Sequence, residues 1–161
     1  MQKLNIVSMA LVLLTAACGF HLRGVGGELM PLPYQTWQIE QTQGLEEYLH
    51  DELKRYGVKI VHKNDTPTAE IRVLALHRQR DVSTLSRIGT VSEYLLTLRV
   101  SVQVSYQGQD VGSPIAITLN RRLSYEDNDL FGKQLEEEAL WEDMYQDAAV
   151  QIVRRLPYIV K

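Results

Sequence analysis

Ser92–Tyr106, with the sequence SEYLLTLRVSVQVSY, has the most regular hydrophobic pattern in this 161-residue chain. Apolar residues fill one set of alternate positions: Tyr94, Leu96, Leu98, Val100, Val102, Val104 and Tyr106. The other set is Glu93, Thr97, Arg99, Ser101, Gln103 and Ser105, interrupted only by Leu95. Side chains alternate between the two faces of a β-strand, so this pattern predicts a long strand with one buried and one wet face.

The neighbouring segments extend this strand into a sheet. After a turn expected around Gly108–Pro114, apolar residues alternate again at Ile115, Ile117, Leu119, Leu123 and Tyr125. The two runs predict an antiparallel pair. Upstream, EIRVLALHRQR from Glu70 is more nearly apolar on both sides, which predicts an interior strand. Trp37–Ile39 and Val58–His62 are expected to form shorter strands.

Two segments have the period of an amphipathic helix. In GLEEYLHDELKRYG, apolar residues recur three or four positions apart, and Gly57 follows as a stop signal. The second helix follows Asp127–Asp129, any of which could cap it, and its apolar stripe is Leu140, Met144, Ala148, Ile152 and Leu156. Pro157 is expected to end it.

The order of these elements predicts an α+β fold. The simplest arrangement is a two-layer sandwich, with two α-helices packed on one face of a mixed, mostly antiparallel sheet of four to five strands. The opposite face of the sheet is expected to stay polar and uncovered. It would carry Thr97, Arg99, Ser101, Thr118, Asn120 and Arg122.

The start of the chain resembles an export signal that ends at a cysteine. Lys3 precedes an apolar block at Leu4–Leu14, which is too short to cross a bilayer as a helix. The small residues Thr15, Ala16 and Ala17 then lead to Cys18, the single cysteine of the chain, in the manner of a bacterial lipobox. A plain secreted protein with a free thiol is the less favoured interpretation, because acylation explains the position of Cys18. The residue after Cys18 is Gly19 and not Asp, which in enteric bacteria is the signal for retention in the inner membrane. The expected location is therefore the outer membrane.

These features divide the chain into three parts. Residues 1–17 are the expected lipoprotein signal peptide, and residues 18–35, rich in glycine and proline, are a lipidated tether. Residues 36–161 are expected to fold as one α+β domain. With 45% apolar residues, 23% charged residues and a net charge of -3, the composition is globular.

No residue pattern indicates catalysis, a metal or a cofactor. The four histidines lie in separate segments without metal-ligand spacing, and the acidic run Glu136–Glu138 wraps around a helix. Glu70–Tyr125 holds seven arginines against four acids, which fits either phosphate binding or soluble strand surfaces. The negative net charge disfavours nucleic acid as a partner. We therefore expect a protein that is not an enzyme.

Four segments in order carry a family resemblance. They are CGFHLRG at Cys18, SEYLLTLRV at Ser92, NRRLSYEDNDLFGK at Asn120 and DMYQDAAVQIVRRLP at Asp143. Together they resemble the LptE family of LPS-assembly lipoproteins, over nearly all of the chain after the signal peptide. The resemblance implies a partner, the large outer-membrane β-barrel LptD, whose lumen the protein plugs and whose assembly it supports. It also implies lipopolysaccharide binding and help with insertion of lipopolysaccharide into the outer leaflet.

The resemblance also suggests site residues. Arg87 and Lys133 match basic positions of the family, and we expect them to converge at one end of the domain and contact lipid A phosphates. Solvated surface charges are the alternative for both. The expected barrel contacts are Leu85, Ser86, Ile88, Arg99, Arg122 and Leu140. Cys18 is the expected site of lipid attachment.

Two other classes of protein remain open at this point. One is a periplasmic accessory lipoprotein of an inner-membrane transporter, which would fractionate with the inner membrane. The other is an envelope hydrolase whose catalytic residues are scattered in the sequence; a pocket with two titratable groups would be its sign.

Overall fold

The computed structural model describes residues 30–61, 69–125 and 130–159. The elements in chain order are β1 (Thr36–Glu40), α2 (Glu46–Arg55), β2 (Lys59–Ile60), β3 (Ala69–Leu85), β4 (Val91–Tyr106), β5 (Gln109–Ser124) and α3 (Leu130–Ile159). The strands form one open sheet in the order β2-β1-β3-β4-β5. β1 is parallel to β2 and β3, whereas β3, β4 and β5 are antiparallel neighbours. This is the two-layer α+β fold that the sequence predicts.

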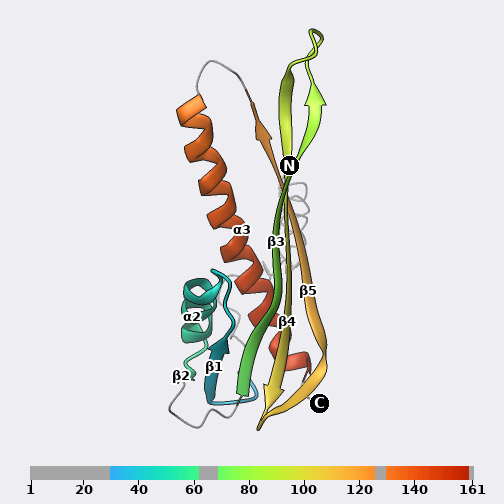
Figure 1. Cartoon of the computed structure of the whole chain (residues 1–161). Helices are drawn as coiled ribbons and strands as arrows, with labels where there is room; N and C mark the ends of the chain where they lie inside the picture. The colour runs from blue at the N-terminus through green and yellow to red at the C-terminus, as the bar shows by residue number, and fades with distance from the viewer. Residues whose placement is uncertain (1–29, 62–68, 126–129, 160–161) are drawn as a thin grey trace, which may run out of the picture.

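The long strand at the centre of the prediction is β4, and its alternation sets the two faces of the sheet. Leu96, Leu98 and Val100 are at most 2% exposed, and they pair with Arg121, Leu119 and Ile117 of β5. α3 packs along this side of the sheet, which we call the covered face, and α2 packs against α3 (Figure 1). The opposite side is the open face.

The hydrophobic core lies between the covered face and the two helices. Its large, fully buried side chains are Trp37, Leu45, Leu49, Leu53, Ile71, Leu96, Leu98, Leu123, Trp141, Met144, Ile152 and Leu156. Near the start of the domain, the ring of Tyr34 stacks on that of Tyr106 at 4.5 Å and lies 5.7 Å from Trp37. Burial of aromatic side chains contributes most per residue to such a core.

The turn between β4 and β5 is shorter than predicted. Gln107 and Gly108 alone form it, with φ of 50° and 78°, as a two-residue hairpin turn with left-handed residues requires. Gly112 and Pro114, which were expected in the turn, lie inside β5. Val102 and Val104 of β4 pair with Ile115 and Val111 of β5. β5 therefore has two more residues than β4 between these pairs, and the extra residues form a bulge.

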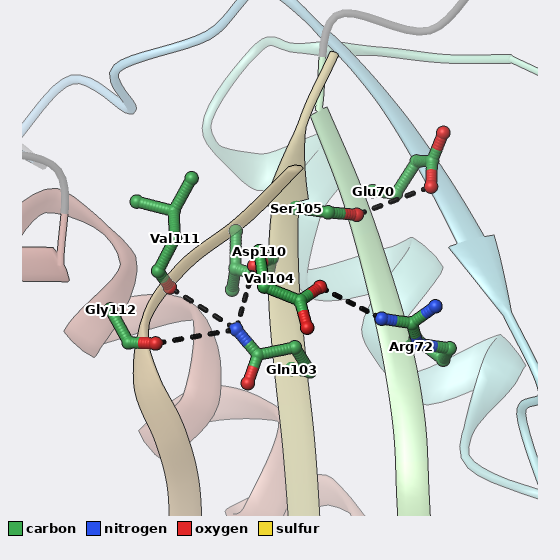
Figure 2. Close-up of polar contacts among 8 residues, drawn as sticks. All are labelled: Glu70, Arg72, Gln103, Val104, Ser105, Asp110, Val111 and Gly112. Atoms are coloured by element: carbon green, nitrogen blue, oxygen red, sulfur yellow. Dashed lines mark hydrogen bonds and ion pairs between the residues drawn. The ribbon is translucent and has the colours of Figure 1, made fainter. Parts of the chain in front are cut away.

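A buried amide fills the gap in the sheet at this bulge. Gln103 is 5% exposed, and its side-chain nitrogen donates to the carbonyls of Val104 at 2.9 Å, Val111 at 3.3 Å and Gly112 at 3.4 Å (Figure 2). Gln103 thus supplies a hydrogen-bond donor to three carbonyls beside the register shift, where buried backbone groups need partners. The polar residue predicted for a wet face is therefore buried for a structural reason.

Three element boundaries correct the sequence prediction. Pro157 does not end α3, which continues to Ile159, because a proline in the last turn removes only one helical hydrogen bond. Of the strand expected at Val58–His62, only Lys59–Ile60 pairs in the sheet, and His62 lies outside the described residues. β3 is longer than EIRVLALHRQR and continues to Leu85. The candidate caps Asp127–Asp129 also lie outside the described residues.

The sheet narrows toward one end of the molecule. β1 pairs with β3 only as far as Arg72, and β5 pairs with β4 only as far as Glu93. Beyond these points β3 and β4 continue as a two-stranded hairpin that extends past the start of α3 (Figure 1). The first turns of α3 lie at this same end, which we call the hairpin end.

Candidate functional site

The tip of the β3–β4 hairpin holds one group of predicted contact residues. Ser86 and Thr90 close it through a backbone hydrogen bond of 2.7 Å and a hydroxyl contact of 2.7 Å. Leu85 and Ile88 on either side are 57% and 86% exposed. Arg87 lies between them, and among the described residues no hydrogen bond or ion pair holds it. The tip therefore presents apolar side chains and one cation to the surroundings.

The open face of the sheet holds the second group. Arg99 donates to the side-chain oxygen of Gln79 at 2.7 Å, and Arg122 lies 3.8 Å from Glu93 with 74% of its side chain exposed. Thr97 differs from the expectation of an uncovered residue, because it is 4% exposed and donates to Asn120 at 2.9 Å. The surface is polar and hydrogen-bonding but not a continuous basic patch.

The arginines of the sheet divide between the two faces. Arg78 and Arg80 of β3 and Arg121 of β5 lie on the covered face and pair with acids of α3. Hydrogen bonds with Asp147 and Asp143 raise the pKa of the Arg121 guanidinium above its ordinary value. The arginines of Glu70–Tyr125 therefore do not form one continuous basic face. The alternation of side chains along β3 would have indicated this division, since Arg78 and Arg80 lie two and four residues after Leu76 and so on the same face of the strand.

Lys133 lies in the first turns of α3, beside a cavity of about 390 Å³. Its ammonium group is 2.7 Å from Glu136 on the same helix. The cavity lies between α3 and the sheet and is lined by Arg80, Leu123, Tyr125, Lys133, Gln134, Glu137 and Glu138. The cation that shares this cavity with Lys133 is thus Arg80, whereas Arg87 is at the hairpin tip. Sequence analysis did not assign Arg80 to any site.

Leu140 lies on a third surface. It is partly buried on α3 and packs against the hydrophobic core.

A second, larger cavity of about 510 Å³ is at the other end of the molecule, between β1, α2 and β2. Its titratable lining residues are Glu40, Glu46 and His50. Within the described ranges, no three His, Cys, Asp or Glu side chains are grouped to hold a metal. Cys18 lies outside the described residues.

The comparisons with known proteins decide the family. The family model described as "LptE: Lipopolysaccharide-assembly" matches residues 34–156. An LPS-assembly lipoprotein LptE from Pectobacterium atrosepticum is 33% identical over 153 residues, which cover 90% of this chain and 79% of the relative. The chain belongs to the LptE family. A second LptE, from Yersinia enterocolitica, is also 33% identical, over 90% of this chain and 70% of the relative.

Solved LptE-like lipoproteins have the same fold. An uncharacterized lipoprotein B from Nitrosomonas europaea superposes with a TM-score of 0.71 at 29% identity, covering 86% of this chain and 90% of that one. A minor lipoprotein from Acinetobacter baumannii gives a TM-score of 0.66 at 28% identity, covering 80% and 94%. The LptE family is defined by LPS assembly, which is not an enzymatic activity. None of the helices that the structure describes is long and apolar enough to span a membrane.

Proposed function

We propose that this LptE-family protein is an outer-membrane lipoprotein, anchored through acyl chains on Cys18, that plugs the LPS-translocating barrel LptD. In this role it supports assembly of the barrel, binds lipopolysaccharide and helps to insert it into the outer leaflet. The observation that carries the proposal is the open face of the sheet. Its hydrogen-bonding side chains suit the polar lumen of a large barrel.

The predicted contacts lie on separate surfaces, which supports a plug more than a flat docking site. Leu85, Ser86 and Ile88 are at the hairpin tip, Arg99 and Arg122 are on the open face, and Leu140 is on α3. A partner that touched all three would have to surround the domain. A barrel lumen can do this, whereas a transporter domain on one side cannot.

Pull-down of the native protein tests the partner. The C-terminally tagged chain is purified from mild-detergent extracts of outer membrane, washed at high salt and examined by mass spectrometry, with the untagged chain as control. Recovery of one large β-barrel in near-equal amount supports the proposal. Recovery of the lipoprotein alone, or with an inner-membrane transporter, contradicts it.

A charge-reversal pair tests lipopolysaccharide binding. Arg87 is in the turn between β3 and β4, and Lys133 is in the first turns of α3, where it pairs with Glu136. Both cations could contact phosphates of lipid A. Arg87→Asp with Lys133→Asp is expected to weaken binding and reduce its salt dependence. Lys54→Asp with Lys59→Asp is the matched control, since it changes the net charge equally at two exposed positions at the end opposite the hairpin. Equal binding by both double variants would remove the two residues from the proposal.

A further inference from the structure

The cavity between α3 and the sheet brings together two cations from distant parts of the sequence. Arg80 comes from β3 and Lys133 from the first turns of α3. At about 390 Å³ the cavity has room for a phosphate group and part of the sugar that bears it. Leu123 of β5 and Tyr125, which directly follows β5, supply apolar and aromatic lining.

Arg80 is held in place by its neighbours. Its guanidinium lies 3.8 Å from the centre of the Tyr94 ring, and one of its nitrogens is 3.0 Å from Glu137. Glu137 in turn accepts a hydrogen bond of 3.3 Å from the indole nitrogen of Trp141, which is 2% exposed. A guanidinium has five N–H donors in a fixed plane, so this contact leaves other donors available. With 39% of its side chain exposed, Arg80 can offer them to the cavity.

The second cation is Lys133, whose side chain is 22% exposed. Lys133 contacts Glu136 three residues further along the same helix, an ion pair of a kind that contributes little in water. An ammonium group can leave such a partner for a phosphate at small cost, and its three donors suit a phosphate oxygen. Glu137 and Glu138 also line the cavity, and Glu137 already pairs with Arg80. The donors that could hold a phosphate are therefore the guanidinium N–H groups not used by Glu137 and the ammonium of Lys133.

We infer that this cavity is a phosphomonoester subsite, in which Arg80 and Lys133 bind the phosphate and Glu137 positions Arg80. The inference rests on the proposed function, because the phosphate group would be one carried by the sugar of a glycolipid such as lipid A. Free phosphate has the same chemistry, and the experiment separates the two. Arg80 is a new residue of the site, and Arg87 belongs to a different surface.

Arg78 provides a matched control on the same strand. It lies two residues from Arg80 on the same face, pairs with Glu138 at 3.2 Å and is 4.4 Å from the centre of the Trp141 ring. Its side chain is 37% exposed, close to the value for Arg80, yet it does not line the cavity. Arg78→Gln therefore removes the same charge and a similar ion pair from a side chain that does not line the cavity, although its partner Glu138 does.

The experiment measures binding of the full mature protein to lipopolysaccharide with intact lipid A phosphates and to the same material after enzymatic removal of those phosphates. Arg80→Gln is expected to weaken binding of the phosphorylated ligand about tenfold, the loss of one charge-assisted hydrogen bond. It should leave the dephosphorylated ligand unaffected. Arg78→Gln should change either affinity less than about twofold. Arg80→Lys keeps the charge but not the planar set of guanidinium donors, so it should recover part of the lost affinity. It also preserves the test if Arg80→Gln fails to fold.

Glu137→Gln tests the positioning role. It keeps the shape of the side chain but removes the charge that orients Arg80, so it should weaken binding of the phosphorylated ligand and leave the thermal midpoint within a few degrees. If Arg80→Gln and Arg78→Gln bind alike, the subsite is wrong and the proposed function stands. If the wild-type protein binds neither ligand, the subsite and the lipopolysaccharide-binding part of the proposed function both fail. Inorganic phosphate that binds at the same residues, with no effect of lipid dephosphorylation, would also overturn the glycolipid assignment.

Discussion

Gln103 is 5% exposed, and its amide nitrogen faces three backbone carbonyls at the β4–β5 bulge. Replacing it with glutamate keeps the size but turns the donor into an acceptor. We expect Gln103→Glu to lower the free energy of unfolding by about 2 kcal/mol at pH 8, since buried carbonyls would face a carboxylate. Gln103→Ala, which removes the donor without adding a charge, is the comparison.

The loss in free energy of unfolding caused by Gln103→Glu should become larger as the pH rises. Three carbonyls disfavour the carboxylate, so the folded-state pKa of the introduced carboxyl group would lie above its unfolded value. The variant is then most stable below the unfolded pKa and loses stability as the pH rises through the folded pKa. Urea unfolding at pH 4 and pH 8 checks this. A Gln103→Glu penalty that does not change with pH, after subtracting the wild-type change, would contradict the assigned hydrogen bonds.

Gly112 lies at the same bulge with a φ of 65°. A Cβ there would be 2.7 Å from the Cγ2 atom of Ile159 in the last turn of α3. Gly112→Ala should therefore combine left-handed strain with a steric clash and destabilise the protein by about 2 kcal/mol. Gly108→Ala is the control, because Gly108 has a φ of 78° with nothing within 4 Å of the added atom. Equal unfolding midpoints for the two variants would show that the contact with Ile159 does not matter.

At the scale of elements, α3 is held to the sheet in two different ways. From Trp141 to Leu156, each turn carries buried side chains, among them Met144, Ala148 and Ile152. From residue 131 to residue 140 no described side chain is buried, and the contacts to β3 are ion pairs to Glu137 and Glu138. Partly exposed ion pairs contribute far less than buried apolar area.

Hydrogen exchange should follow this division. We expect amide protection to fall from residues 144–156 toward residues 134–140 of α3, because the first part can open without exposing the core. Raising the salt concentration to about 1 M should speed exchange in the first part only, since salt screens exposed ion pairs. Mass spectrometry of exchanged peptides measures both effects. Uniform protection along α3 would show that the ion pairs hold as strongly as the core.

The elements also show what the sequence could and could not predict. Strict alternation predicted β4 because one face of that strand is buried almost throughout. Gly112 and Pro114 suggested a turn, and only long-range pairing could reveal that both lie inside β5, where Gln103 bonds to the Gly112 carbonyl. In the same way, the repeated arginines of β3 marked a charged region, but the cavity beside Lys133 depends on where α3 packs. Contacts between distant segments, not local patterns, limited the prediction of the site.

At the scale of the whole molecule, the sheet offers a polar face that neither helix covers, while the apolar residues of the hairpin tip extend beyond the body (Figure 1). Thr97, Arg99 and Asn120 already bond to neighbours on the open face, so that surface is ordered before any partner arrives. A preorganised polar surface loses little conformational entropy on binding. The proposed plug therefore does not require the domain to refold.

Charge reversal on the open face tests the plug directly. Arg99→Asp with Arg122→Asp should at least halve the amount of barrel that copurifies after a high-salt wash, because two buried polar contacts would become repulsive or unpaired. The unfolding midpoint should change little, since Arg122 is 74% exposed and Arg99 bonds only to a neutral amide. Lys54→Asp with Lys59→Asp, again of equal charge change, controls for net charge. If the control loses the barrel equally, net charge and not the open face governs the association, and the polar face would need another explanation.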